Sequence, residues 1–186
     1  MKELSLHILD VAKNSVKAGA TLIEIDICTD ERGFMTIRIA DNGCGMTDEV
    51  LLRVTDPFYT TRTTRKVGLG LPLLRLAAEQ TGGGLKISSS TKEGSSGTVV
   101  EASFDTTSID CMPMGDIVST VVTLIAGSPE KDFVFSDTDK RKESKVNLDT
   151  RQMRDILGED VPLDALEIQM WMSEYLCEQY ENKTEN

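Results

Sequence analysis

The segment FMTIRIADNGCGM, residues 34–46, joins a predicted β-strand to a short glycine-rich loop. Its first eight residues, 34–41, alternate apolar and polar side chains, which is typical of a strand with one buried face. Asp41 ends this strand, and Gly43 and Gly45 follow it. A carboxylate acceptor beside backbone that no side chain covers suits a planar ring that bears an amino group. An ordinary Asn-Gly turn is the alternative interpretation of the same residues.

Upstream of this strand, LSLHILDVAKNSVKAGA at residues 4–20 predicts a helix with a polar stripe. At about 100° per residue, four polar residues fall inside one arc of roughly 80°: His7, Asp10, Asn14 and Lys17. The opposite side is aliphatic and wide enough to pack against a core. A solvated face is one interpretation of the stripe. Asn is a poor helix former, however, so its place inside a helix calls for a further role.

A second glycine motif, GLGL at residues 68–71, precedes a helix predicted at residues 71–84. Glycines before a helix N-terminus leave backbone N–H groups open, and the positive end of the helix dipole favours phosphate. The loop before it, DPFYTTRTTRKV at residues 56–67, supplies Arg62, Arg65 and Lys66 and is suited to closing over phosphates. A purely structural turn is the alternative for GLGL alone.

The remaining pattern predicts two domains, at residues 1–105 and 106–186. In the first, strands are expected at 21–29, 34–41, 85–90 and 97–104, with a short helix at 46–54. In the second, a buried helix at 115–127 precedes a hairpin built from 131–137 and 145–149, and two closing helices follow at 149–158 and 162–180. The last helix carries Met170, Trp171, Met172 and Tyr175, which suit either a contact patch or a core.

Composition and charge limit the classes of function. The longest apolar run, IVSTVVTLIA from Ile117, is too short to span a bilayer, and the N-terminus lacks a signal-peptide pattern. Four cysteines share no metal or redox spacing, which indicates reduced thiols and a cytoplasmic location. Of the net charge of −11, residues 105–186 carry 8 basic and 18 acidic side chains, or −10. We therefore expect no membrane and no nucleic acid as partner, while a basic protein partner is permitted.

Taken in order, the striped helix, DNGCGM, the DPFYTTR loop, GLGL and the late strand GTVVEASF resemble the boxes of the GHKL ATPase superfamily. The superfamily is named from gyrase, the heat-shock chaperone, histidine kinases and MutL. The resemblance covers about residues 1–105 and implies the Bergerat ATP-binding fold, an α/β (α+β) two-layer sandwich with a mixed β-sheet. Residues 106–186 would then add a small α+β appendage. KNSVKAGATLIEIDI is similar to MutL, whereas the DPFYTTR and GLGL segments are similar to a sensor histidine kinase.

The resemblance also implies roles for individual residues toward ATP and Mg²⁺. Asn14 matches the asparagine that binds Mg²⁺, Lys17 a phosphate contact, Asp41 the acceptor of the adenine amino group, and Thr98 the residue behind the adenine. The full implied nucleotide-binding set is Asn14, Lys17, Asp41, Gly43, Gly45, Met46, Phe58, Thr61, Arg62, Gly68, Leu69, Gly70, Leu71 and Thr98.

Asp10 is the expected catalytic residue, a general base one turn before Asn14 on the same helix face. The hydrolytic and serine-kinase branches of the superfamily usually hold Glu there, and Asp is one methylene shorter. If no helical acceptor segment precedes Met1, as we expect, His7 would be the only histidine available as a phosphate acceptor in cis. Its place in the ATP domain itself favours a packed side chain instead.

These implications give an expected function. The chain would be an ATP- or ADP-binding, Mg²⁺-dependent ATPase or protein kinase that acts with a separate protein partner in bacterial-type regulation, with a homodimer possible. A non-catalytic ATP sensor, which regulates a partner through its nucleotide-dependent conformation, is the alternative.

Overall fold

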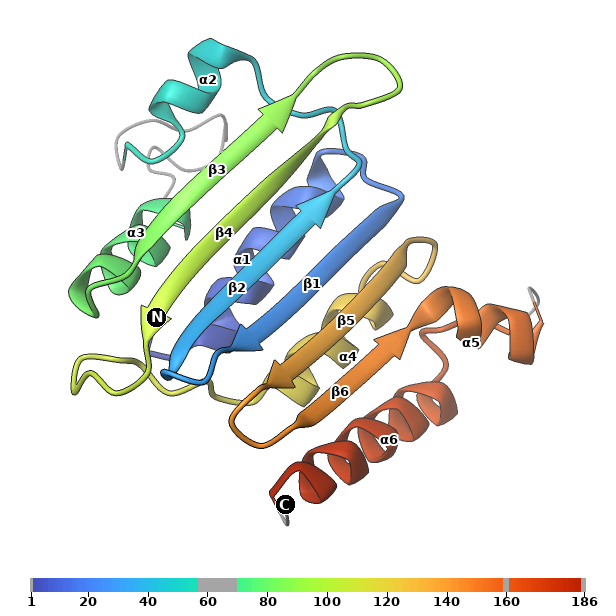
Figure 1. Cartoon of the computed structure of the whole chain (residues 1–186). Coiled ribbons are helices and arrows are strands. Elements are labelled where there is room, and N and C mark those ends of the chain that lie inside the picture. Colours follow the sequence, from blue (N-terminus) through green and yellow to red (C-terminus); the bar gives the residue numbers. More distant parts are fainter. Residues whose placement is uncertain (1, 57–69, 159–160, 185–186) are drawn as a thin grey trace.

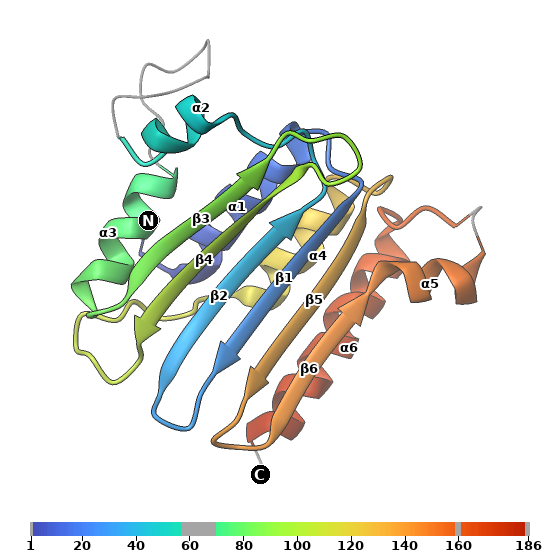
Figure 2. The ribbon, with the colours of Figure 1, turned by 45° about the horizontal axis from the view of Figure 1, so that its top comes forward.

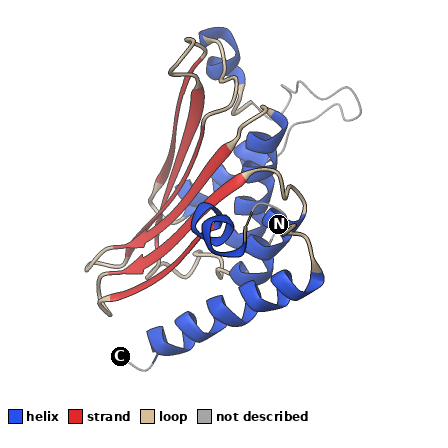
Figure 3. Ribbon diagram, turned by 90° about the vertical axis from the view of Figure 1, so that its right-hand side faces the viewer, coloured by secondary structure: helices blue, strands red, loops and turns tan. Residues whose placement is uncertain are grey.

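One face of a single β-sheet carries the helices of this protein (Figures 1 and 3). The computed structural model describes residues 2–56, 70–158 and 161–184. The helices are α1 (Leu4–Lys17), α2 (Asp48–Arg53), α3 (Gly70–Gln80), α4 (Ile117–Ala126), α5 (Thr150–Leu157) and α6 (Leu166–Thr184). The strands are β1 (Leu22–Thr29), β2 (Phe34–Asp41), β3 (Gly84–Ser90), β4 (Gly97–Asp105), β5 (Asp132–Asp139) and β6 (Ser144–Asp149). The predicted helices and strands are therefore confirmed, with small changes at their ends.

The strands lie in the order β3-β4-β2-β1-β5-β6, and the sheet is mixed because β1 and β5 run parallel while the other neighbours are antiparallel. The two-layer α+β sandwich is thus confirmed. The strands of residues 106–186 continue the sheet of residues 1–105 across the β1–β5 pair. The C-terminal segment is an extension of that sheet, and its division from residues 1–105 as a separate domain stays a prediction.

Alternation along the strands builds the core, as the sequence pattern predicts. In β1 every second side chain is buried, and these are Ile23, Ile25, Ile27 and Thr29. They face an apolar layer to which α1, α3, α4 and α6 contribute. Figure 2 shows α1, α4 and α6 behind the strands and α3 beside β3. The opposite face of β1 and β2 is polar, and Arg38 pairs there with the carboxylate of Asp26 at 2.9 Å. Because only one face of the sheet is buried, a shift of one residue would expose the apolar side chains, and this fixes the strand register.

The first turn of α1 depends on the segment that follows β4. Glu3 makes no side-chain cap at this helix. Instead, the amides of Leu4 and Ser5 donate to the carbonyl oxygens of Pro113 and Met114, at 3.0 and 2.8 Å. These bonds satisfy two of the N–H groups that a helix start leaves open. The position of α1 is therefore tied to the C-terminal half of the chain.

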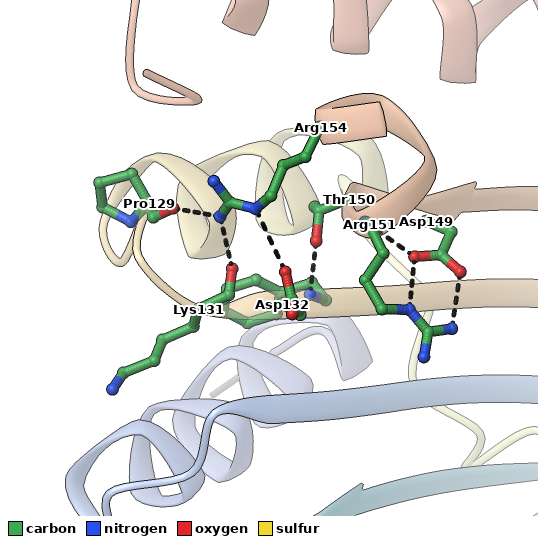
Figure 4. A network of polar contacts seen from close by, with 8 residues as sticks. Pro129, Lys131, Asp132, Asp149, Thr150, Arg151 and Arg154 are labelled. Atoms are coloured by element: carbon green, nitrogen blue, oxygen red, sulfur yellow. Dashed lines mark hydrogen bonds and ion pairs between the residues drawn. The ribbon is translucent and has the colours of Figure 1, made fainter. Parts of the chain in front are cut away.

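Polar contacts fasten α5 to the start of β5 (Figure 4). The Arg154 guanidinium donates to the Asp132 carboxylate and the Lys131 carbonyl, both at 3.2 Å. Thr150, which is fully buried, accepts a hydrogen bond from the amide of Phe133 at 2.8 Å. The turn from β6 into α5 is thus held against the strand that joins the two halves of the sheet.

Helix α6 covers the end strand β6. The side-chain amide of Gln179 accepts from the Asn147 amide at 2.9 Å and donates to the Asn147 carbonyl at 3.0 Å, so it occupies both groups of that residue on the sheet edge. Tyr180 donates to the Asp137 carboxylate at 2.8 Å, and burial raises the pKa of its hydroxyl, so Tyr180 stays a neutral donor.

The aromatic and methionine residues of α6 divide between core and surface. Met172 is fully buried, whereas Met170 and Trp171 are exposed and Trp171 stacks on Tyr175. In the described part of the chain, no helix has the length and apolar character needed to cross a membrane.

Phe135→Ala tests how far the two halves unfold together. Phe135 on β5 is 1% exposed, so its truncation is expected to lower the free energy of unfolding by about 3–5 kcal/mol. Urea unfolding would be followed by the fluorescence of Trp171, the single tryptophan, and by far-UV circular dichroism. We expect one transition, shifted equally in both signals.

The matched control is Phe34→Ala on β2, where the ring is 39% exposed and the expected loss is under about 1 kcal/mol. Two separate transitions, of which Phe135→Ala shifts only the one reported by Trp171, would instead establish residues 106–186 as an independent unit.

Candidate functional site

The carboxylate of Asp41 is fixed from two sides at the end of β2. Ser15 on α1 donates its hydroxyl to Oδ2 at 2.6 Å, and the Gly43 amide donates to Oδ1 at 2.9 Å. Ser15 is 4% exposed. Each oxygen of an ionised carboxylate has two lone pairs, so Asp41 can accept further hydrogen bonds at a set position. This is the fixed acceptor that the DNGCGM motif predicts.

The loop after Asp41 needs its glycines because backbone crowds it. A β-carbon on Gly43 would lie 2.9 Å from both Cβ and the carbonyl oxygen of Ala18. Gly45 has a φ of +71°, and a β-carbon there would collide with the carbonyl oxygen of Ser90. Asn42 has a structural role, since its side-chain oxygen accepts from the amides of Thr21 and Leu22 at 2.8 and 3.0 Å. Asn42 therefore has the structural role expected of an ordinary turn. Gly43 and Gly45 are required because neighbouring backbone approaches them closely.

Thr98 lies beside Asp41. The two residues are register partners between β2 and β4, and Ser89 on β3 is the next partner in the same row. The Ser89 hydroxyl lies 2.8 Å from the Thr98 hydroxyl, 2.8 Å from the Gly97 carbonyl oxygen and 2.8 Å from the amide nitrogen of Met46. Ser89 thus joins the loop after Asp41 to the two strands beside it.

A second group of polar residues lies on α1 near the start of α3. A β-carbon on Gly70, the first residue of α3, would lie 2.7 Å from a carboxylate oxygen of Asp10. Asp10 and Asn14 are one turn apart and partly exposed, and Lys17 ends the helix at an exposed position. The structure therefore brings Asp10 against Gly70, at a helix N-terminus that favours anions. Leu71 lies in the first turn of the same helix.

His7 does not belong to the exposed part of the stripe. Its side chain is 2% exposed, and its Nδ1 has no hydrogen-bond partner among the described residues. Burial, assisted by the positive N-terminus, lowers the pKa of His7, against a smaller opposing effect of Asp10. A packed imidazole is what we expected, and the structure buries it.

Five of the predicted nucleotide-binding residues lie outside the described part of the chain, and they are Phe58, Thr61, Arg62, Gly68 and Leu69. Sequence reasoning missed Ser15 and Ser89, whose hydroxyls fix Asp41 and contact Thr98. Ser15 could have been found, because a serine that is buried with the apolar face of a helix needs a polar partner for its hydroxyl.

The model of one family, described as histidine kinase-, DNA gyrase B- and HSP90-like ATPase, matches residues 2–108. The chain belongs to this ATPase family. The match ends just after β4, so it contains Asp10, Asn14, Asp41 and Thr98. Family membership supports binding of ATP and agrees with the resemblance drawn from the motifs.

One curated relative matches about half of this ATPase-family chain. Sporulation kinase B of Bacillus subtilis (strain 168) is 31% identical over 100 residues, which are 52% of this chain and 23% of the kinase. The chain thus spans less than a quarter of that curated relative.

Two solved structures share the fold over most of the chain. The Aquifex aeolicus MutL ATPase domain complexed with ADP has a TM-score of 0.55 at 14% identity, over 84% of this chain and 69% of that one. The N-terminal domain of a DNA repair protein has a TM-score of 0.57 at 16% identity, over 80% and 53%. Both matches extend beyond residue 108, so the likeness of fold includes part of the C-terminal extension.

Gly45→Ala tests the crowding of the loop. A β-carbon at Gly45 meets both a left-handed φ and the Ser90 carbonyl, so we expect a loss of about 2–4 kcal/mol in the free energy of unfolding. Gly94→Ala is the control, because Gly94 has a similar φ of +79° but open space around its Cα. Its expected loss is about 1 kcal/mol, measured by the same urea unfolding. Equal losses in the two variants would contradict the close approach.

His7→Leu tests the burial of a neutral imidazole. The folded-state pKa of His7 lies below the ordinary value of 6.5, so below pH 6.5 the unfolded chain binds a proton that the folded chain does not. Stability is therefore fully present above pH 6.5 and falls as the pH drops, by at most about 1.4 kcal/mol per pH unit. Urea unfolding of both proteins between pH 7.5 and pH 5, at roughly half-unit steps, should show this loss in the wild type and not in His7→Leu. Parallel pH profiles would be the contrary result.

Proposed function

We propose that this chain binds ATP with Mg²⁺ and uses it together with a separate protein, by phosphoryl transfer or by hydrolysis coupled to a conformational change. The observation that carries this proposal is the doubly held Asp41 carboxylate, which lies beside Thr98 in a chain of the ATPase family. In this proposal Asp41 receives the adenine amino group and Thr98 lies behind the base. Gly43, Gly45 and Met46 form the wall of backbone next to it.

The phosphates would lie toward α1 and the start of α3. The N-terminus of α3 offers N–H groups and the positive end of its dipole, and Gly70 and Leu71 are its first residues. Asn14 and Lys17 follow Asp10 along the same helix. Phe58, Thr61, Arg62, Gly68 and Leu69 complete the proposed nucleotide-binding set from the sequence alone.

The donor set fits Mg²⁺ shared with phosphate. Asn14 brings an amide oxygen from α1, and Asp10, one turn before it, is kept for the general-base role. Mg²⁺ sites at nucleotides use one or two protein oxygens, and phosphates and water supply the others. When bound, Mg²⁺ neutralises charge that develops on the transferred phosphoryl group.

Asp10 is the proposed general base. Its carboxylate lies at the N-terminus of α3, where the proposal places the phosphates, so it can accept a proton from water or from a hydroxyl of the protein substrate. Lys17 would hold phosphate charge, and the backbone of α3 would orient the nucleotide. In a site of this kind, positioning contributes most of the catalysis, because the protein forms no covalent bond to the phosphoryl group.

A kinase name among the relatives favours phosphoryl transfer to a partner over simple hydrolysis. The acidic segment after residue 105 favours a basic partner surface, in keeping with its net charge of −10. A cytoplasmic location and a homodimer remain part of the proposal.

Three variants test this function with radiolabelled ATP. The wild type should bind ATP in the presence of Mg²⁺ and release labelled phosphate or pass it to a partner protein. Asp41→Ala should lose at least about tenfold in ATP affinity, since a charge-assisted hydrogen bond contributes roughly 1.5–3 kcal/mol. Asp10→Ala should keep its affinity within about threefold and lose turnover by about 100-fold or more, because general-base catalysis contributes that much.

Asp155→Ala, which removes an exposed carboxylate on α5, is the control and should match the wild type in both assays. Absence of ATP binding by the folded wild type would refute the proposal. Tight binding without turnover, unchanged by Asp10→Ala, would identify the chain as a nucleotide sensor instead.

A further inference from the structure

The Ser89 hydroxyl contacts three polar groups, and the family resemblance assigns Ser89 itself no role. It lies on β3, in one row with Thr98 and Asp41 on the helix-covered face of three adjacent strands. We infer that Ser89 determines the specificity of the site for the base: it takes the hydroxyl proton of Thr98, so that Thr98 and Asp41 present only acceptors. This inference rests on the proposed function, because it concerns the base that lies against Asp41.

The hydrogen bonds of Ser89 fix the direction of each proton. A serine hydroxyl has one proton to donate and two lone pairs that accept. The Gly97 carbonyl oxygen, at 2.8 Å, has no proton, so Ser89 must donate to it. The Met46 amide, at 2.8 Å, can only donate, so it uses one lone pair of Ser89. The Thr98 hydroxyl, also at 2.8 Å, is then a donor to the remaining lone pair.

Thr98 therefore has no proton left for a ligand. Its oxygen keeps lone pairs, which can only accept. Asp41 is in the same state, because its ionised carboxylate has no proton and already accepts from Ser15 and Gly43. Two neighbouring residues in one row thus form a recognition surface made of acceptors alone.

Such a surface selects the chemistry of the ring position that faces it. An amino group on a purine, as in adenine, brings two N–H donors and satisfies acceptors. A carbonyl oxygen at the same position, as in hypoxanthine or guanine, brings lone pairs toward lone pairs. A buried acceptor without a donor costs the desolvation free energy of that group, so the carbonyl base is disfavoured. Ser89 is a positioning residue in this scheme, since it acts through Thr98.

Ser89→Ala tests the inference with ATP and inosine triphosphate, whose bases carry an amino group and a carbonyl oxygen at this ring position and differ also in the proton on the adjacent ring nitrogen. The measured quantity is the ratio of the Kd for inosine triphosphate to the Kd for ATP. In the variant the Thr98 proton is released and can turn toward the ring oxygen, so we expect the ratio to fall roughly fivefold or more. A loosened loop would weaken both nucleotides equally and leave the ratio unchanged. The ratio therefore separates specificity from structure.

Three further variants complete the design. Ser88→Ala changes the neighbouring serine, which points to the other face of β3 and is exposed, and it should keep the wild-type ratio. Ser89→Thr retains a hydroxyl and should restore the ratio. In a Thr98→Val background, Ser89→Ala should no longer change the ratio, because the proton that it releases is absent.

An unchanged ratio in Ser89→Ala, or the same fall on the Thr98→Val background, would overturn the inference while ATP binding by the wild type still stands. A wild type that binds ATP and inosine triphosphate equally would also overturn it. A folded wild type that binds neither nucleotide would refute the proposed function itself, and the inference with it.

Discussion

The hydrogen bond between Ser15 and Asp41 joins the helix layer to the end of the sheet. At 2.6 Å, and with Ser15 almost fully buried, it is a short charge-assisted bond to a partly exposed carboxylate. It sets where α1 lies along β2, because slippage of either element would leave a buried hydroxyl and a carboxylate without each other. Asp10 and Asn14 are on the same helix as Ser15, so their positions relative to Asp41 follow from this one contact. The base end and the phosphate end of the proposed site are thus linked by α1.

The C-terminal extension adds to that constraint from the other end of α1. Carbonyl oxygens of Pro113 and Met114 complete its first turn, and both residues lie beyond the part of the chain that the family model matches. The extension also pairs β5 with β1, which would otherwise be the edge of the sheet. A protein bound to the extension would therefore contact a segment that is joined to α1 by backbone hydrogen bonds and by the packing of α1 on α4. This gives the proposed partner a short physical route to Asp10.

Local patterns in the sequence predicted most elements, because alternation and helical periodicity report burial within a few residues of each other. The parallel pairing of β1 with β5 could not be predicted this way. It joins segments about a hundred residues apart, and neither segment has a local sequence pattern that indicates its partner. The helical arc placed His7 in one stripe with Asp10, Asn14 and Lys17 because it treats all polar side chains alike, and the packed side chain expected for His7 is what the structure shows. Ser15 and Ser89 were missed because the position of a serine in the sequence does not indicate which oxygen of another element its hydroxyl will contact.

The candidate site obtains its selectivity from hydroxyl protons more than from the shape of its wall. Glycines keep the loop backbone close, but a close backbone admits any flat ring. The direction of a proton is more discriminating, because a wrong base leaves its own lone pairs facing the acceptors of the site. Ser15 gives its proton to Asp41, Ser89 gives its own to the Gly97 carbonyl, and Thr98 gives its own to Ser89. Each donation removes a donor from the surface that meets the ligand, and the strands hold the acceptors that remain in one fixed row.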